Sequence, residues 1–184
     1  MDIFLDIETV PLKPGEHLSE DGNDIGALSP ITGKIMAVGW SIRGEPKIAV
    51  GEEKEVLEKF WDSMRSIHTI GGTIRFIGFN IRQFDMHFIL VRSLAHNLPI
   101  VPFARRSIVD LRDILTLFQR KKGTLQDYAL MLGESKFDNW SHEDIFAAWE
   151  KQDLESITLY LEKDIDITKK LYMKLQKLNM LSLL

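Results

Sequence analysis

The sequence predicts an α/β domain with a mixed five-stranded sheet flanked by helices. Three observations support this fold class: strand-like apolar segments come first, strand-like and helix-like segments then alternate, and helix-like segments complete the chain. With 184 residues, of which 45% are hydrophobic, the chain is long enough to bury one core. We therefore expect a single domain over residues 1–184.

Five segments are expected as strands. The first lies in "MDIFLDIETVPL" at the N-terminus. Two more, "KIMAVGWSI" (34–42) and "KIAVG" (47–51), flank the tight turn "RGEP" and predict a β-hairpin beside the first strand. The last two are expected in "TIRFIGF" (73–79) and at 107–110. Before the hairpin, the segment from Pro11 to Pro30 is rich in Pro, Gly and acids without periodicity, which predicts a long loop.

Helices are expected where apolar residues recur every three or four positions. In the segment 52–67, Val56, Phe60 and Met64 mark one such face. A second helix is expected in "RQFDMHFILVRSLAHN" (82–97). The remaining helical patterns lie at 111–118, 125–132, 143–149 and 153–178.

The composition narrows the chemistry that the chain can support. Without cysteine there are no disulfides or thiolate ligands, so a metal would be held by carboxylates, imidazoles or water, which favours Mg²⁺ or Mn²⁺ over zinc. No apolar run could span a bilayer, and the N-terminus lacks the basic flank and apolar block of a secretory signal, so we expect a cytoplasmic protein without membrane contact. The net charge of −4 does not exclude nucleic-acid binding, because bound divalent ions would offset the charge of clustered acids.

Two acids interrupt the first strand. Side chains alternate along a strand, so Asp6 and Glu8 point to the same side, opposite to Ile3, Leu5 and Ile7. The Cα atoms of the two acids would lie roughly 7 Å apart, at about 3.3 Å rise per residue. Their charges then repel unless a cation lies between them, and a metal ion is the simplest candidate.

Two further acids stand where an apolar residue is expected. Asp85 lies near the start of a helix in "GFNIRQFDMHFIL", where an acid is often a partner of the helix dipole, but its neighbours are apolar. Asp164 interrupts the apolar face of the last helix, four residues after Tyr160. Taken alone, Tyr160 is typical of a core aromatic residue with its hydroxyl at the surface.

The four acids and the tyrosine, in this order, resemble the DEDD family of 3′–5′ exonucleases, which have a ribonuclease H-like fold. "DIET" is similar to the first motif of that family, "NIRQFD" to the second and "YLEKD" to the third. A tyrosine in the third motif indicates the tyrosine subtype, since the nearest upstream histidine is His142. The chain is similar to free-standing predicted exonucleases related to the proofreading domain of family B DNA polymerases.

The resemblance implies hydrolysis of phosphodiester bonds from the 3′ end of single-stranded nucleic acid, with release of nucleoside 5′-monophosphates and the help of two Mg²⁺ or Mn²⁺ ions. Asp6 would bridge both ions. Glu8 and Asp164 would complete the site that activates water, whereas Asp85 would hold the second ion largely through water. Tyr160 would orient the attacking water.

The same resemblance implies where the substrate binds. Backbone groups of Thr9 and Val10 would contact the terminal nucleotide. Asn80 and Phe84 would bond to or pack on the strand, although a structural role explains Phe84 equally well. Kinship with proofreading domains favours single-stranded DNA as the partner, but related tyrosine-type enzymes process RNA. Without an accompanying polymerase domain, a polymerase or repair protein in trans is a further candidate partner.

Basic and aromatic residues outside the motifs are weaker candidates. One basic group could follow phosphates, although such residues are more often simply solvated: Arg105, Arg106, Arg112, Arg120, Lys121 and Lys122. Trp140, in a polar stretch, is a candidate stacking platform for a base. The other tryptophans, Trp40, Trp61 and Trp149, are expected in the core.

Two other classes of function stay open. "DIETV" differs by one residue from the Asp-x-Asp-x-Thr/Val opening of haloacid dehalogenase-like phosphatases, but Glu8 departs from that pattern and the later motifs would be unexplained. The other class is a nuclease-like binding module without catalysis. Such modules usually lack one of the metal acids, and this chain has all four.

Overall fold

The computed structural model describes residues 1–16, 18, 22, 25–42, 44–71, 73–117, 119, 123–134 and 140–183. Over these residues the chain forms a five-stranded sheet with the strand order β3-β2-β1-β4-β5. The strands are β1 (Asp2–Pro11), β2 (Gly33–Ser41), β3 (Lys47–Val50), β4 (Arg75–Gly78) and β5 (Ile108–Asp110). β2 lies antiparallel to both β1 and β3, whereas β4 lies parallel to both β1 and β5. The mixed five-stranded sheet and the hairpin expected from the sequence are confirmed.

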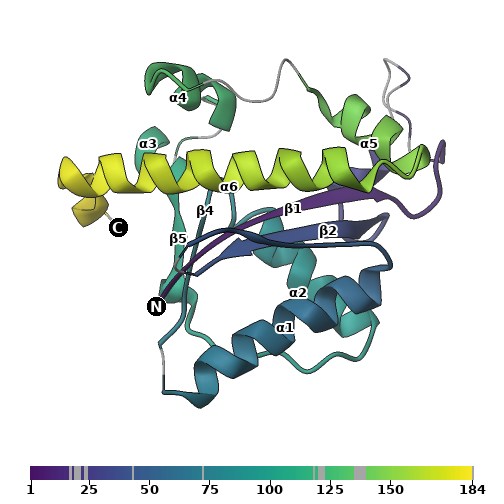
Figure 1. Cartoon of the computed structure of the whole chain (residues 1–184), viewed down its shortest axis with the longest axis horizontal. Coiled ribbons are helices and arrows are strands. Elements are labelled where there is room, and N and C mark those ends of the chain that lie inside the picture. The colour runs from purple at the N-terminus through teal and green to yellow at the C-terminus, as the bar shows by residue number, and fades with distance from the viewer. Residues whose placement is uncertain are drawn as a thin grey trace.

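Helices cover both faces of the sheet. α1 (Glu53–Thr69) and α2 (Asp85–Ala95) pack on one face, and α6 (Leu154–Lys177) crosses the other (Figure 1). On the side of α6 lie the shorter helices α3 (Leu111–Thr116), α4 (Leu125–Met131) and α5 (His142–Glu150). Three 3₁₀ turns are also described: η1 (Gly26–Leu28), η2 (Arg105–Ser107) and η3 (Met180–Leu183). Each expected helix is present, with ends shifted by a few residues. Across the described ranges, no helix has both the length and the apolar character to cross a membrane.

The side chains of β1 alternate between two cores, as the sequence predicts. Ile3, Leu5 and Ile7 are buried in the core formed with α1 and α2. Phe4 is buried on the opposite face, in the core formed with α6. Asp6 and Glu8 lie two and four residues after Phe4, so their side chains are on the same side of the strand and face α6.

α6 lies close to the sheet because one position of β2 has no side chain. Gly39 pairs with Asp6 across the β1–β2 ladder, so both residues face α6. A Cβ at Gly39 would lie 2.6 Å from Cδ1 of Ile165 and 2.8 Å from Cδ1 of Ile48, which is much closer than carbon atoms pack. This glycine lets α6 approach the strand that carries the acids.

The segment between β1 and β2 is hydrogen-bonded to the sheet near the C-terminal end of β1. Oγ1 of Thr9 donates a 2.7 Å hydrogen bond to the carbonyl of Ala27, and Oγ1 of Thr32 donates one of 2.8 Å to the carbonyl of Gly26. The long loop expected from 11 to 30 therefore contains a 3₁₀ turn held against β1, just beyond Glu8. Residues 17, 19–21 and 23–24 of this loop lie outside the described residues.

A buried ion-pair network links α1, α2 and β2. Glu53, only 6% exposed, accepts the backbone N–H of Ile35 at 2.7 Å. Its carboxylate also binds the guanidinium of Arg92 and the imidazole of His96, each at 2.7 Å. Burial by itself would raise the pKa of Glu53, but the hydrogen bonds from these three partners outweigh it, so the pKa lies below its usual value.

Candidate metal centre

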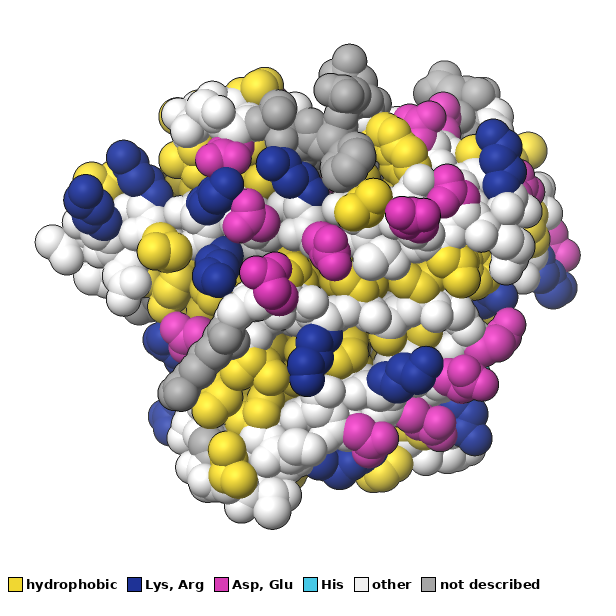
Figure 2. Space-filling model, in the orientation of Figure 1, with side chains coloured by type: hydrophobic (Ala, Val, Ile, Leu, Met, Phe, Trp, Pro, Cys, Tyr) yellow, Lys and Arg dark blue, Asp and Glu magenta, His cyan; other side chains and the backbone are white. Residues whose placement is uncertain are grey.

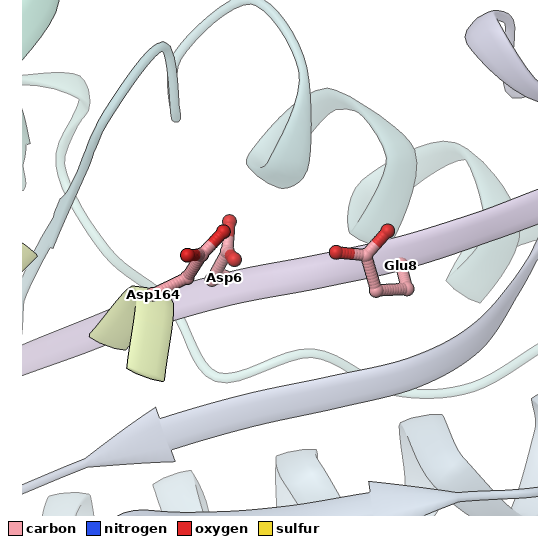
Figure 3. Close-up of side chains that lie close together, drawn as sticks. All are labelled: Asp6, Glu8 and Asp164. Carbon is pink, nitrogen blue, oxygen red and sulfur yellow. The ribbon is translucent and has the colours of Figure 1, made fainter. Parts of the chain in front are cut away.

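Three carboxylates from two distant parts of the chain meet on the α6 face of the sheet. Asp6 and Glu8 extend from β1 and Asp164 from α6, and each offers an oxygen within 4.8 Å of those of the other two (Figure 3). Glu8 and Asp164 are buried, whereas Asp6 is half-buried. Three like charges at this separation, with little solvent around them, call for a counter-charge.

Two local features bring these side chains together. In α6, the residues that share a face with Asp164 are buried: Ile157, Tyr160, Leu161, Thr168 and Leu171. The acid that interrupts this face therefore points at β1, as the sequence predicts. In β2, Met36 is an extra residue, because Glu8 pairs with Ala37 and Thr9 with Ile35. Such a bulge bends the ladder directly beside Glu8.

Asp85 reaches the same group from the start of α2. It is 2% exposed, and its side chain hydrogen-bonds that of Asp6. The pairing of β1 with β4 ends at Phe4 and Ile77, and beyond that point Oδ1 of Asp85 accepts the backbone N–H of Ile7 at 3.1 Å. Asp85 thereby occupies the place where β1 and β4 diverge, next to Asp6, and lies outside the group of three carboxylates that meet within 4.8 Å.

The electrostatics of this group favour a bound cation. Burial raises the pKa of Asp85 to about 7, and the nearby charge of Asp110 adds to the rise, against the hydrogen bonds that the carboxyl group receives. A divalent ion would lower the free energy of keeping this carboxyl group ionised beside the carboxylate of Asp6. The donor set fits this ion, because carboxylate oxygens are the ligands that suit Mg²⁺ and Mn²⁺.

The sequence patterns do not single out a fifth buried acid, Asp110. It ends β5 and is 1% exposed. Its carboxylate accepts three backbone N–H groups, those of Asn80 (2.9 Å), Arg82 (3.0 Å) and Arg112 (3.0 Å). It thereby fixes the turn between β4 and α2 that leads to Asp85. Its only sequence signal is an acid between an apolar strand and a helix, which equally describes an ordinary N-cap.

Asn80 and Phe84, the predicted substrate contacts of the second motif, lie in this turn. Asn80 has a φ of 62°, a left-handed conformation that asparagine tolerates better than most residues. Its Oδ1 accepts a hydrogen bond from Nη1 of Arg112 at 3.1 Å. Phe84 is half-buried, and its ring centre lies 5.0 Å from that of Phe88, so core packing accounts for its residue type.

Thr9 and Val10, the predicted substrate contacts of the first motif, directly follow Glu8 on β1. They pair with Ile35 and Lys34 of β2, and Val10 is buried while Thr9 is half-buried. Their position beside the carboxylates agrees with the expectation, and contact with a nucleotide stays a prediction.

Tyr160 lies under a second aromatic ring. It is 8% exposed, and the ring of Trp140 stacks on it with centroids 6.0 Å apart and an interplanar angle of 27°. Trp140, which the sequence suggests as a platform for a base, thus packs on the tyrosine of the third motif. Its contact with a base stays a prediction.

The remaining tryptophans only partly follow expectation. Trp40 and Trp61 are buried in the core, as predicted. Trp149 is half-buried and packs at the edge of a core cluster, with Nζ of Lys34 6.0 Å from its ring centre, so its predicted core position is confirmed only in part. The physical reason is that Ile145 and Ala148 form the buried face of α5.

The basic residues that the sequence suggests for phosphate binding differ in their surroundings. Arg105 and Arg106 are exposed in η2, whereas Arg112 is half-buried beside Asn80. Residues 120–122 lie outside the described residues.

The fold and the site together define a class of protein. The mixed sheet, with α1 and α2 on one face and α6 on the other, is a ribonuclease H-like fold, and it carries a carboxylate cluster with the donor set of a divalent metal site. Residues 34–181 match the family described as predicted 3′–5′ exonucleases related to the exonuclease domain of PolB. Because this segment covers more than half of the chain, the chain belongs to that family. The segment contains Asp85 and Asp164 but begins after β1, so it is the structure that adds Asp6 and Glu8.

The solved structures agree on the fold. The family B DNA polymerase from the hyperthermophilic archaeon Pyrobaculum calidifontis is similar, with a TM-score of 0.72 and 18% sequence identity. The similarity covers 97% of this chain and 25% of that chain, so this chain spans about a quarter of the polymerase's length. No curated protein matches the sequence. Family and fold both argue against a haloacid dehalogenase-like phosphatase.

Proposed function

We propose that the protein is a metal-dependent 3′–5′ exonuclease of the tyrosine subtype of the DEDD family. It hydrolyses phosphodiester bonds from the 3′ end of single-stranded nucleic acid, with DNA the preferred substrate, and releases nucleoside 5′-monophosphates. The observation that carries the proposal is the convergence of the Asp6, Glu8 and Asp164 carboxylates within 4.8 Å, with Asp85 hydrogen-bonded to Asp6 beside them.

The four acids would hold two Mg²⁺ or Mn²⁺ ions. When bound, the ions supply an activated water, a counter-charge for the phosphate in the transition state and help for the leaving oxygen. Asp6 has the central position among the four acids, because its carboxylate is close to those of Glu8 and Asp164 and also lies beside Asp85. The carboxylate of Asp85 accepts a hydrogen bond from the backbone N–H of Ile7, which orients it.

Tyr160 would orient the attacking water. It lies one helical turn before Asp164 on the same buried face of α6, so the two side chains are neighbours on the helix surface. The stacked ring of Trp140 restricts the tyrosine ring. A hydroxyl group whose ring is already held loses less conformational entropy when it binds a water molecule, so this packing suits a residue that orients water.

The substrate strand would lie across the carboxyl ends of β1 and β4. Thr9 and Val10 follow Glu8 on β1, and their backbone would contact the terminal nucleotide. Asn80 and Phe84, in the turn before Asp85, would contact the nucleotides of the substrate that precede the terminal one. A polymerase or repair protein acting in trans is the class of partner that such an activity would serve.

Hydrolysis of matched oligonucleotides tests the proposal. A 5′-labelled single strand of DNA and an RNA of the same sequence are incubated with Mg²⁺, Mn²⁺ or EDTA, beside the Asp6→Ala variant. We expect a metal-dependent ladder with nucleoside 5′-monophosphates as products, faster on DNA, slowed by a 3′-phosphate and abolished by Asp6→Ala. Early release of the 5′ label would overturn the direction of cleavage. A wild-type protein that binds the strands but leaves them intact would instead be the nuclease-like binding module.

A further inference from the structure

Of the seven arginines among the described residues, four already have an acidic partner. Arg65, Arg75, Arg82 and Arg92 each contact a carboxylate at 2.6–2.7 Å. In the view of Figure 2, the Lys and Arg side chains of the described residues are interspersed with Asp and Glu, and these residues form no continuous basic track on that face. A strand of nucleic acid bound near four acids needs a cation that is not already neutralised.

Arg112 is such a cation. Its Nη1 donates to Oδ1 of Asn80 at 3.1 Å, and no carboxylate among the described residues lies within 4.0 Å of its guanidinium. The neighbouring Arg82 differs, because it is paired with Asp113 at 2.7 Å. Arg112 is half-buried, so its charge is less screened by solvent than that of the exposed Arg105.

The sheet places Arg112 at the same edge as the metal centre. Phe4 pairs with Ile77 and Ile77 with Val109, so the end of β5 lies level with the start of the acidic part of β1. Two strand spacings of about 4.8 Å separate β1 from β5, or roughly 10 Å. Arg105 lies before β5, at the opposite end of the strand. Of the two, only Arg112 is on the side where the substrate strand would leave the metal centre.

We propose that Arg112 and Asn80 form a subsite for a backbone phosphate of the single strand, other than the phosphate that is cleaved. The proposal rests on the proposed function for the identity of the ligand. A guanidinium offers several N–H donors in one plane, of which Asn80 uses one, and it binds phosphate oxygens through the others. Because the amide oxygen of Asn80 accepts from Arg112, its NH₂ group is left to donate to the same ligand.

Two links hold this pair in place. The carboxylate of Asp110 accepts the backbone N–H of both Asn80 and Arg112, at 2.9 Å and 3.0 Å. The carbonyl of Asn80 also accepts the backbone N–H of Phe84 at 3.0 Å, directly before Asp85 at the start of α2. A phosphate bound at Arg112 would therefore fix the strand relative to Asp85 and the adjacent carboxylate cluster.

The test measures binding separately from cleavage. Affinity for a single-stranded DNA is measured with Ca²⁺ in place of Mg²⁺, under conditions where the strand stays intact, for wild type, Arg112→Gln, Arg112→Lys and the control Arg105→Gln. We expect Arg112→Gln to weaken binding about tenfold and to reduce the slope of log Kd against log salt by about 0.7, the value for one single-strand phosphate. Arg112→Lys should keep most of the slope, and Arg105→Gln should match wild type.

A second measurement changes the substrate instead of the protein. Uncharged methylphosphonate linkages are placed one at a time along the strand. In the wild type, one position other than the cleaved linkage should lower the affinity, and in Arg112→Gln the same position should have no effect. Wild-type affinity and slope in Arg112→Gln, or an undiminished effect of that linkage, would overturn the subsite. A wild type that binds through Arg112 but cleaves nothing with Mg²⁺ or Mn²⁺ would contradict the proposed function and keep the subsite.

Discussion

The carboxylate of Asp85 accepts the backbone N–H of Ile7 at 3.1 Å, so an acid at the start of α2 is bound to the strand between the two acids of the first motif. The bond forms where the pairing of β1 with β4 has ended at Phe4 and Ile77. A backbone donor that the sheet leaves without a strand partner is thus satisfied by a residue of the candidate site. The same atoms serve the stability of the sheet and the position of a proposed metal ligand.

Substitutions of Asp85 should separate these two roles. Asp85→Asn keeps an oxygen for the N–H of Ile7 and removes a charge that is costly to bury, so the thermal stability of the metal-free protein should stay the same or rise. Its metal affinity and nuclease rate should fall together, the rate by at least about 10²-fold. Asp85→Ala should lose the same activity and also about 1–3 kcal/mol of stability, because the N–H is left unsatisfied. Thermal unfolding and calorimetric metal titration measure both effects. Equal stability of the two variants would contradict the structural role.

The two members of the third motif should respond differently to substitution. Asp164→Ala should weaken metal binding and abolish turnover together. Tyr160→Phe keeps the ring that packs under Trp140 and deletes only the hydroxyl, so metal affinity and unfolding temperature should change little. The rate should still fall, within the 10²–10⁴-fold range for a group that handles a proton and nearer its lower end. Single-turnover cleavage at saturating metal measures this.

Trp140 provides a control for the role of the tyrosine. If the tryptophan acts by holding the ring of Tyr160, Trp140→Leu should slow the wild type but have no further effect in the Tyr160→Phe background. Additive effects in the double variant, with a raised KM, would instead make Trp140 a contact for a base. Full activity of Tyr160→Phe would make Tyr160 a core aromatic residue only.

Asp110 should prove important without touching a metal. Asp110→Asn can accept hydrogen bonds through one oxygen only, whereas the carboxylate uses both to bind Asn80, Arg82 and Arg112. We expect a loss of about 1–3 kcal/mol in stability and a lower rate at saturating metal, with metal affinity reduced less than in Asp85→Asn. Urea unfolding and metal titration compare the two. A variant with wild-type stability and rate would show that the turn before Asp85 does not depend on this acid.

The Glu53 network should make stability depend on pH. The pKa of Glu53 is lower in the folded protein than in the unfolded chain, so its stabilising effect is present above the unfolded pKa of about 4.3 and is lost as the pH falls through the folded pKa. At pH 7, Glu53→Gln should lower the free energy of unfolding by about 2–4 kcal/mol, because Arg92 is left buried without its partner. The difference from wild type should shrink in acid.

An exposed pair on the same helix is the matched control. Lys54 and Glu58 lie 3.9 Å apart, with side chains 59% and 44% exposed, and Glu58→Gln should change the free energy of unfolding by no more than about 0.5 kcal/mol at any pH. Urea unfolding at a series of pH values compares the variants. A Glu53→Gln difference that persists unchanged in acid would contradict the assigned ionisation.

The parts of the site that follow local periodicity could be predicted from the sequence. The two-residue repeat of β1 put Asp6 and Glu8 on one face, and the helical repeat of α6 put Asp164 on the buried stripe; both predictions are confirmed. Trp149 shows the weakness of arguing from residue type alone, because α5 buries Ile145 and Ala148 and leaves Trp149 at the edge of the core.

The parts that depend on where strands end could not be predicted. The bond from Ile7 to Asp85 joins residues 78 positions apart and exists only because β1 outruns β4. Asp110 resembles an N-cap and is one, since it accepts the N–H of Arg112 at the start of α3. Its second task, holding the turn after β4, arises from the parallel pairing of two strands whose partners no local pattern specifies.

Gly39 controls how closely α6 approaches β2, and with it the distance between Asp164 and Asp6. Any side chain at this position would require Ile165 and Ile48 to move or α6 to lift away from β2. Asp164 would then withdraw from Asp6, which pairs with Gly39. Mg²⁺ binds oxygens at about 2.0–2.1 Å and Ca²⁺ at about 2.3–2.6 Å, so a shift of a few tenths of an ångström separates the coordination of a small ion from that of a large one. The spacing of the proposed metal ligands, and with it the ionic radius that such a centre would accept, therefore depends on a helix–sheet contact at a residue that has no side chain of its own.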